Sequence, residues 1–122
     1  VRLLQIDAPE ESTDCYGHAA TSALLRLTPR GSHVTLVRDP RLDAHDAYGR
    51  LLRYVFVGAV NVNVRLVREG AASPYFFRKQ RGRYAGELLD AVDAARRAQA
   101  GYWGACPRAE LNTGLGSVTG SR

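Results

Sequence analysis

The loop after the first predicted strand carries carboxylates at a spacing that suits a metal ion. Asp7 and Glu10 flank Ala8 and Pro9 in this loop, and Arg2 precedes them on the strand. Two carboxylates without a thiol or grouped histidines suit a hard cation such as Ca²⁺ or Mg²⁺, and the Ala8 carbonyl could add an oxygen. The alternative interpretation is a solvated capping loop that binds no ligand.

A second segment, residues 46–50, reads Asp-Ala-Tyr-Gly-Arg and places Arg50 after a glycine turn, at the start of a strand. A guanidinium presents a planar fork of donors that matches a phosphate. Arg2 and Arg50 together could therefore bind one phosphate group. The alternative is an arginine at a strand edge that forms only a surface ion pair.

A third segment joins aromatic and basic residues. Tyr75, Phe76 and Phe77 are followed by the basic tract 78–83. Aromatic rings can stack nucleic-acid bases while neighbouring cations follow the backbone, so we assign these rings and Tyr48 to substrate binding. The competing interpretation is that at least one of the three consecutive rings belongs to the hydrophobic core.

Other nucleophilic and metal-binding patterns are missing. The three histidines do not form a cluster, and no serine or cysteine has the sequence context of a covalent nucleophile, so covalent catalysis is not expected. Cys15 and Cys106 lie near opposite ends of the chain and belong to no zinc motif. Two interpretations remain for them, a pair of buried thiols or one disulfide in an oxidising compartment.

Hydrophobic periodicity predicts the elements that position these residues. We expect strands over residues 1–6, 33–38 and 50–57, and helices over 17–27, 63–69 and 84–100. These elements predict an α+β domain over residues 1–106 whose strands curl into a small barrel. Residues 107–122 are expected to form a flexible C-terminal tail, because the Gly/Ser/Thr-rich stretch 112–122 lacks core residues.

Composition limits the class of protein. The chain has 122 residues, of which 45% are hydrophobic and 24% charged, as expected for one globular domain with its own core. The net charge of +5 attracts polyanions without selecting among them. The longest apolar run, 54–60, is far below the roughly 20 residues of a membrane span, so we expect no membrane partner. We also expect a monomer.

Four motifs together resemble the staphylococcal nuclease (thermonuclease-like) family, in the order and spacing of that family. They are Val-Arg-Leu-Leu-x-x-Asp-x-Pro-Glu at 1–10, Asp-x-Tyr-Gly-Arg at 46–50, Val-Asn-x-x-Leu-Val-x-x-Gly at 62–70 and Gly-Tyr-Trp-Gly at 101–104. The resemblance implies an OB-fold, a five-stranded β-barrel with three helices, and a Ca²⁺-dependent nuclease that hydrolyses phosphodiester bonds of DNA or RNA.

The resemblance also implies roles for individual residues. Arg2 and Arg50 correspond to the phosphate-binding catalytic arginines, and Glu10 to the general base. Asp7 corresponds to a calcium ligand, joined by the Ala8 carbonyl, and Glu10 is counted as a third residue of this metal site. The alternative function within the same superfamily is an OB-fold module that binds nucleic acid or protein without cutting it.

Three further comparisons with the family concern the cysteines, the start of the chain and two alanines. Cys15 and Cys106 look like the cysteines of secreted bacterial members, which supports a disulfide and a secreted protein. The family carries an Asp-Gly-Asp stretch upstream of the Arg-Leu-Leu strand, so the resemblance implies a fragment that lacks two barrel strands and one metal carboxylate. Ala19 and Ala47 replace a glutamate and a lysine of the family, which bear on helix packing and on substrate binding.

Overall fold

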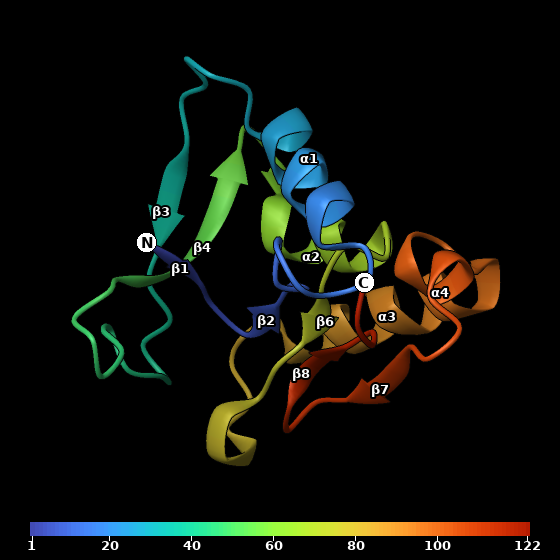
Figure 1. Cartoon of the computed structure of the whole chain (residues 1–122). Coiled ribbons are helices and arrows are strands. Elements are labelled where there is room, and N and C mark those ends of the chain that lie inside the picture. Colours follow the sequence, from blue (N-terminus) through green and yellow to red (C-terminus); the bar gives the residue numbers. More distant parts are fainter.

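A computed structural model describes all 122 residues as a mixed α+β domain (Figure 1). The helices are α1 (Gly17–Leu27), α2 (Val62–Arg68), the 3₁₀ turn η1 (Phe77–Lys79), α3 (Ala85–Ala98) and α4 (Tyr102–Ala105). The strands are β1 (Arg2–Leu3), β2 (Ile6–Asp7), β3 (Thr35–Val37), β4 (Leu52–Val57), β5 (Val60–Asn61), β6 (Ser73–Pro74), β7 (Glu110–Asn112) and β8 (Gly116–Val118).

The strand β4 is the centre of the largest sheet. It pairs antiparallel with β3, with Leu36 opposite Val55, and parallel with β1, with Arg2 opposite Leu52. The short strand β5 also pairs with β4. In Figure 1 the β3–β4 pair extends to one side of the helices, and the β3–β4 connection lies at its lower end.

The strands of this chain do not form a closed barrel. The strand expected over residues 1–6 is broken at Gln5, whose φ of 66° lies in the left-handed region that interrupts a strand. As a result β1 pairs with β4, whereas β2 pairs with β6 in a separate two-stranded sheet. The α+β class and the three long helices agree with the expectation, and the five-stranded barrel is not confirmed.

The three long helices follow the predicted periodicity and supply most of the core. Buried side chains of α1, α2 and α3 meet Ile6 and Val55 in one hydrophobic cluster. The start of α1 requires glycine, because a Cβ at Gly17 would lie 2.2 Å from the carbonyl oxygen of Glu10. This contact holds the loop after β2 against α1. None of the helices combines the length and apolarity needed to cross a membrane.

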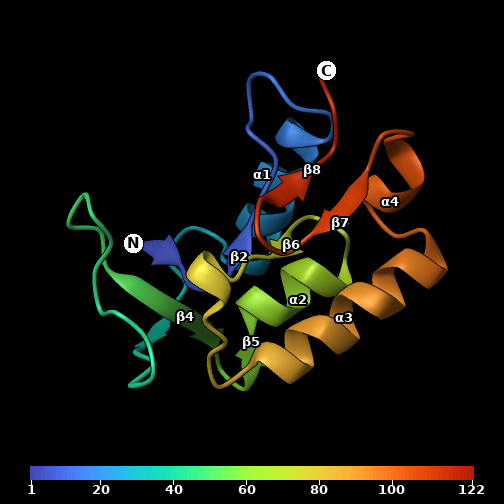
Figure 2. The ribbon, with the colours of Figure 1, turned by 90° about the horizontal axis from the view of Figure 1, so that it is seen from below.

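Residues 107–122 differ from the expected flexible tail. Strands β7 and β8 form an antiparallel hairpin, with Leu111 opposite Ser117. Figure 2 shows this hairpin beside β2 and β6, where the chain enters β7 from α4. The Gly/Ser/Thr-rich composition gave a wrong prediction because the segment is held mainly by backbone hydrogen bonds and by its docking on β2. Gly116 and Thr119 are buried in this contact region.

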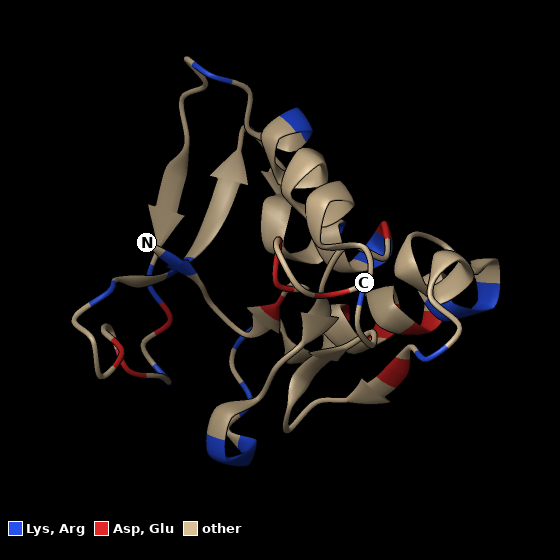
Figure 3. Cartoon of the chain, in the orientation of Figure 1, with Lys and Arg blue, Asp and Glu red and all other residues tan.

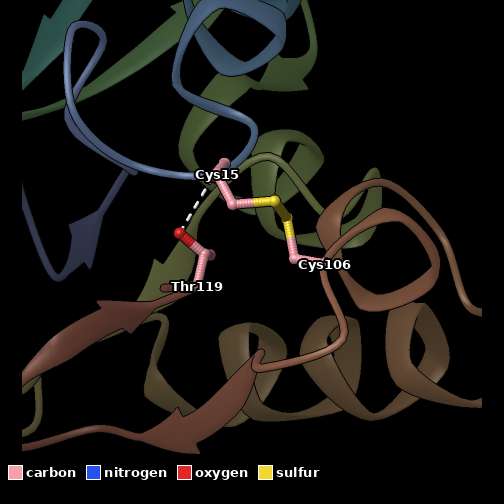
Figure 4. Close-up of a disulfide and its surroundings, with 3 residues drawn as sticks. All are labelled: Cys15, Cys106 and Thr119. Atoms are coloured by element: carbon pink, nitrogen blue, oxygen red, sulfur yellow. Dashed lines mark hydrogen bonds between the residues drawn. A yellow bond between two sulfur atoms is a disulfide. The ribbon is translucent and has the colours of Figure 1, made fainter. Parts of the chain in front are cut away.

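A disulfide between Cys15 and Cys106 joins the start of α1 to the end of α4 (Figure 4). Around it, the Thr119 hydroxyl donates to the carbonyl of Cys15 at 2.9 Å, and the Cys15 N–H donates to the carbonyl of Gly120 at 2.9 Å. The disulfide and the end of the hairpin are therefore parts of one junction.

We expect loss of this disulfide to lower stability substantially. The cysteines are 91 residues apart, and cross-links that close long loops contribute about 2–4 kcal/mol by restricting the unfolded chain. Urea unfolding of the double variant Cys15→Ala/Cys106→Ala should show a loss in this range relative to the oxidised protein. A loss below about 1 kcal/mol would contradict the expectation.

Candidate active site

A cavity of about 600 Å³ brings together five of the residues singled out in the sequence. Arg2 lines it from β1, and Arg50 lines it from the β3–β4 connection together with Tyr48. Tyr75 and Phe77 line it from the segment around η1. Three stretches that lie far apart in the sequence thus form one concave surface, and Figure 3 shows basic residues on each of them.

Strand pairing brings the two arginines to this surface. The backbone N–H of Arg2 donates to the carbonyl of Leu51 at 2.8 Å, the first bond of the parallel β1–β4 pair. Arg50 is the residue immediately before Leu51. The pairing of β1 with β4 therefore places both guanidinium groups on one wall of the cavity.

A tight turn orients Arg50. The Asp46 carboxylate accepts from the backbone N–H groups of Tyr48 and Arg50, both at 2.9 Å, and from Nε of Arg50 at 2.6 Å. Gly49 completes the turn at φ 79°, where glycine is favoured. Arg50 uses Nε in this ion pair, so its two terminal Nη groups stay available for an anion.

These contacts also act on the charge of Asp46. Desolvation would raise the pKa of its carboxyl, but the hydrogen bonds from Arg50 and Tyr48 and the nearby guanidinium lower it below its ordinary value. Asp46 therefore stays ionised and remains an acceptor for Arg50 at neutral pH.

Arg2 is held by a single carboxylate contact. Its Nη2 donates to Oδ1 of Asp7 at 3.2 Å, and its Nη1 lies 3.4 Å from the carbonyl oxygen of Leu3. The pair is partly buried, with 27% of the Arg2 side chain exposed. Because the Asp7 contact uses one donor, other N–H groups of Arg2 remain free for a phosphate.

The aromatic residues separate into two groups. Tyr75 and Phe77 have ring centroids 6.4 Å apart and line the cavity, and the guanidinium of Arg78 lies 5.1 Å from the Phe77 ring centre. Tyr48 is 86% exposed at the rim. Phe76, in contrast, is only 3% exposed and packs in the core, so its assignment to substrate binding is wrong.

Gln5 positions the basic segment through contacts that the sequence did not indicate. Its backbone carbonyl accepts from Tyr75 N–H at 2.8 Å, and its side chain bonds to both ends of a short stretch. Nε2 donates to the carbonyl of Gln80 at 3.0 Å, and Oε1 accepts from Gly82 N–H at 2.8 Å. The residue that breaks the first strand therefore holds the segment that carries Tyr75 and Phe77.

Asp39 provides a second anchor for the same segment. Its carboxylate is 1% exposed and accepts from the Tyr54 hydroxyl at 2.5 Å and from the backbone N–H groups of Arg83, at 2.8 Å, and Arg41, at 2.9 Å. Close packing here requires Gly82, because a Cβ would lie 2.4 Å from Oδ2 of Asp39. A polar loop in the sequence carries no signal that one of its aspartates is buried.

Burial and hydrogen bonding act in opposite directions on Asp39. Burial alone would raise the pKa of its carboxyl, but the bonds from Tyr54, Arg83 and Arg41 outweigh it and lower the pKa below its usual range. The same arrangement raises the pKa of the Tyr54 hydroxyl, first by burial and then by the adjacent carboxylate. Tyr54 therefore remains a neutral donor, and Asp39 remains an ionised acceptor.

The three residues expected to bind calcium do not form a metal site. Asp7 is engaged by Arg2 on Oδ1 and by Ser117 on Oδ2, whereas Ala8 and Glu10 are exposed and do not line the large cavity. No group of three or more His, Cys, Asp or Glu side chains in the chain is arranged to hold a metal ion. Because Ca²⁺ takes six to eight oxygen ligands, this donor set does not fit the ion by itself.

Comparisons with known proteins agree with one another. The model of a family described as staphylococcal nuclease homologue matches residues 1–105. A thermonuclease from Staphylococcus intermedius is 31% identical over 109 residues, covering 84% of this chain and 62% of that protein. An uncharacterized protein from Bacillus anthracis is 33% identical over 108 residues, covering 84% of this chain and 50% of that protein.

A further relative has a nuclease name. An uncharacterized endonuclease from Escherichia coli is 41% identical over 76 residues, covering 62% of this chain and 46% of that protein. The chain thus spans about half the length of the curated relatives it matches.

The Asp39 anchor predicts a dependence of stability on pH. Because folding lowers the pKa of Asp39, its contribution is present above the unfolded value near 3.8 and is lost as pH falls through the folded pKa. Asp39→Asn should lower stability at pH 7 by about 1–3 kcal/mol and flatten the fall in stability below about pH 4. Chemical unfolding at several pH values measures both effects.

Asp43→Asn is the matched control, because Asp43 lies exposed on the same connection. Its stability should follow the wild-type curve within about 0.5 kcal/mol. Equal losses in the two variants would show that the charge of the loop, rather than the buried carboxylate, governs stability.

Proposed function

Because the chain belongs to the staphylococcal nuclease homologue family, we propose that it hydrolyses phosphodiester bonds of nucleic acids. The observation that carries the proposal is the meeting of Arg2 and Arg50 at one cavity whose wall also presents Tyr75 and Phe77. Two guanidinium groups match the charge of a phosphodiester, and the aromatic rings match its bases. The thermonuclease and endonuclease names of similar proteins support the same reaction.

The arginines would act on the charge that develops during hydrolysis. Attack of water on a phosphodiester increases negative charge on the non-bridging oxygens, so donors aligned in advance lower the barrier. Arg50 is aligned by the Asp46 turn, and Arg2 by strand pairing and by Asp7. Neither arginine uses all of its N–H donors on these partners, so both guanidinium groups can also bind the phosphate.

We assign the proton-accepting role to Glu10, on the loop after β2. Its carboxylate forms no ion pair, and its backbone N–H donates to Asp14 at 2.8 Å, which shapes the loop. Glu10 lies outside the cavity lining, so in this role its loop would turn towards a phosphate held by Arg2 and Arg50, and its carboxylate would take the proton of the attacking water as the bond to phosphorus forms. The close contact of Gly17 with the Glu10 carbonyl restrains this loop.

The substrate surface fits single-stranded or unpaired segments of DNA or RNA. Tyr75 and Phe77 offer ring faces for bases, and Tyr48 stands exposed at the rim beside Arg50, with 5.6 Å between the guanidinium carbon and the ring centre. Stacking of this kind tolerates any base, because every base has a π-face. We therefore propose a nuclease with little dependence on sequence.

A calcium requirement, which the family resemblance implies, enters no step of this proposal. Asp7, Ala8 and Glu10 do not form a ligand set of their own. Assays with added Ca²⁺ and with a chelator test the requirement separately from the arginine roles. Loss of cutting on chelation would show that oxygen ligands beyond these three residues complete a metal site.

A module that binds nucleic acid without cutting it is the second candidate, favoured by the same incomplete set of carboxylates. The two functions predict different results with a labelled oligonucleotide. Retention of the intact oligonucleotide supports the binding module, whereas release of shorter products supports the nuclease.

We also propose that the protein works in an oxidising compartment, as a secreted bacterial protein would. The Cys15–Cys106 disulfide supports this proposal, because such bonds persist where thiols are not kept reduced. Alkylation and mass spectrometry of protein isolated from its native source should find both cysteines blocked before reduction. Labelling of both thiols without reductant would contradict it.

We expect Arg50→Ala to lower turnover on a single-stranded oligonucleotide by at least about 10²-fold, the usual effect of losing one aligned donor. Arg50→Lys should recover little, because an ammonium lacks the planar fork. The matched control is Arg97→Ala, which removes an arginine paired with Asp93 on the exposed face of α3. Initial rates by fluorescence dequenching measure all three, and equal losses for Arg50 and Arg97 would contradict the role.

We expect Glu10→Gln to lower turnover by about 10²–10⁴-fold with little change in substrate binding, because the amide cannot accept the proton. The matched control is Glu11→Gln, since Glu11 is exposed on the same loop. The measurements are turnover and oligonucleotide affinity. Near-normal product release by Glu10→Gln would remove the assignment.

A further inference from the structure

The C-terminal hairpin reaches the proposed catalytic arginine through one carboxylate. Ser117 in β8 donates to Oδ2 of Asp7 twice, from its backbone N–H at 2.9 Å and from its hydroxyl at 3.1 Å. The other oxygen of Asp7, Oδ1, accepts from Arg2 at 3.2 Å. The two oxygens of one carboxylate therefore have separate partners.

The close approach of the hairpin depends on the residue before Ser117. Gly116 has a φ of 95° and is buried against Asp7, and a Cβ there would lie 2.5 Å from Oδ2. Glycine thus permits both the backbone conformation and the contact. This arrangement brings the Ser117 N–H and hydroxyl to the same oxygen.

The far end of the hairpin is anchored independently of Asp7. Arg122 N–H donates to the carbonyl of Thr13 at 2.9 Å. The Cys15 N–H donates to the carbonyl of Gly120, and the Thr119 hydroxyl donates to the carbonyl of Cys15. The disulfide closes the same junction (Figure 4). The position of β8 beside Asp7 is therefore fixed by contacts at both ends of the strand.

The division of the Asp7 oxygens has a chemical consequence. A carboxylate and a guanidinium free to rotate tend to form two parallel hydrogen bonds, which would occupy a whole edge of Arg2. Ser117 prevents this because it holds Oδ2, so that only Oδ1 faces the guanidinium. Apart from the Nη1 contact with the Leu3 carbonyl, the remaining donors of Arg2 have no protein partner, and Arg2 lines the cavity.

We propose that Ser117 is a positioning residue that, through Asp7, keeps Arg2 in a singly bonded state able to bind phosphate. The proposal rests on the proposed nuclease function for its kinetic consequence. Ser117 lies outside residues 1–105, the part of the chain that the family model matches, whereas Asp7 and Arg2 lie within it. The hairpin is thereby a functional part of the site.

The kinetic test uses three variants of the whole chain. Ser117→Ala removes the hydroxyl donor, and kcat/KM on a single-stranded oligonucleotide should fall about tenfold, as for other groups that orient a site residue. Ser117→Thr keeps a hydroxyl and should retain activity within about threefold. Thr119→Val removes an anchor bond of the hairpin without touching Asp7, and should lower stability while leaving kcat/KM within about twofold.

A second measurement does not depend on activity. In ¹⁵N-labelled protein, the side-chain N–H signals of Arg2 should shift or broaden in Ser117→Ala and keep their wild-type positions in Ser117→Thr and Thr119→Val. Unchanged Arg2 signals or unchanged kcat/KM in Ser117→Ala would overturn the proposal, as would equal kinetic losses in Ser117→Ala and Thr119→Val. Absence of cutting by the wild-type protein would refute the nuclease function, and the Arg2 signals would then decide the role of Ser117 alone.

Discussion

The parallel pairing of β1 with β4 is the contact on which the site depends. The bond from Arg2 N–H to the Leu51 carbonyl places the opening residues of the chain beside the end of the Asp46 turn. Without it, Arg2 would have no fixed relation to Arg50, and two isolated surface arginines contribute little to binding one anion. A few backbone hydrogen bonds thus create the local positive charge that the proposed nuclease function needs.

Each part of the candidate site is held in place by hydrogen bonds to a carboxylate or an amide side chain. Asp46 aligns Arg50, Asp7 aligns Arg2, and Gln5 and Asp39 hold the segment that carries the aromatic wall. The buried anchors tolerate their polarity because each of their oxygens accepts hydrogen bonds. The hydrophobic contacts of the helices stabilise the fold, whereas these polar contacts determine where the cavity residues lie.

Local patterns predicted the helices well and the sheet poorly. The bounds of α1 agree with the prediction because its apolar spacing and its stop at Pro29 are local properties. The first strand was extended too far, because nothing local shows that Gln5 adopts a left-handed conformation. The C-terminal hairpin was missed for a related reason: its stability comes from docking on β2 and from the junction at Cys15, not from apolar side chains.

The sequence by itself determined the chemical types present: two arginines in strand-and-turn contexts, a loop with carboxylates, an aromatic-basic segment and two separated cysteines. Four motifs in order were enough to indicate the family. Only the tertiary structure decided that Phe76 is core while Tyr75 and Phe77 face the cavity, that the strands form no closed barrel, and that Asp7 is shared between Arg2 and Ser117. These outcomes depend on pairing between distant segments, and local propensity carries no information about such pairing.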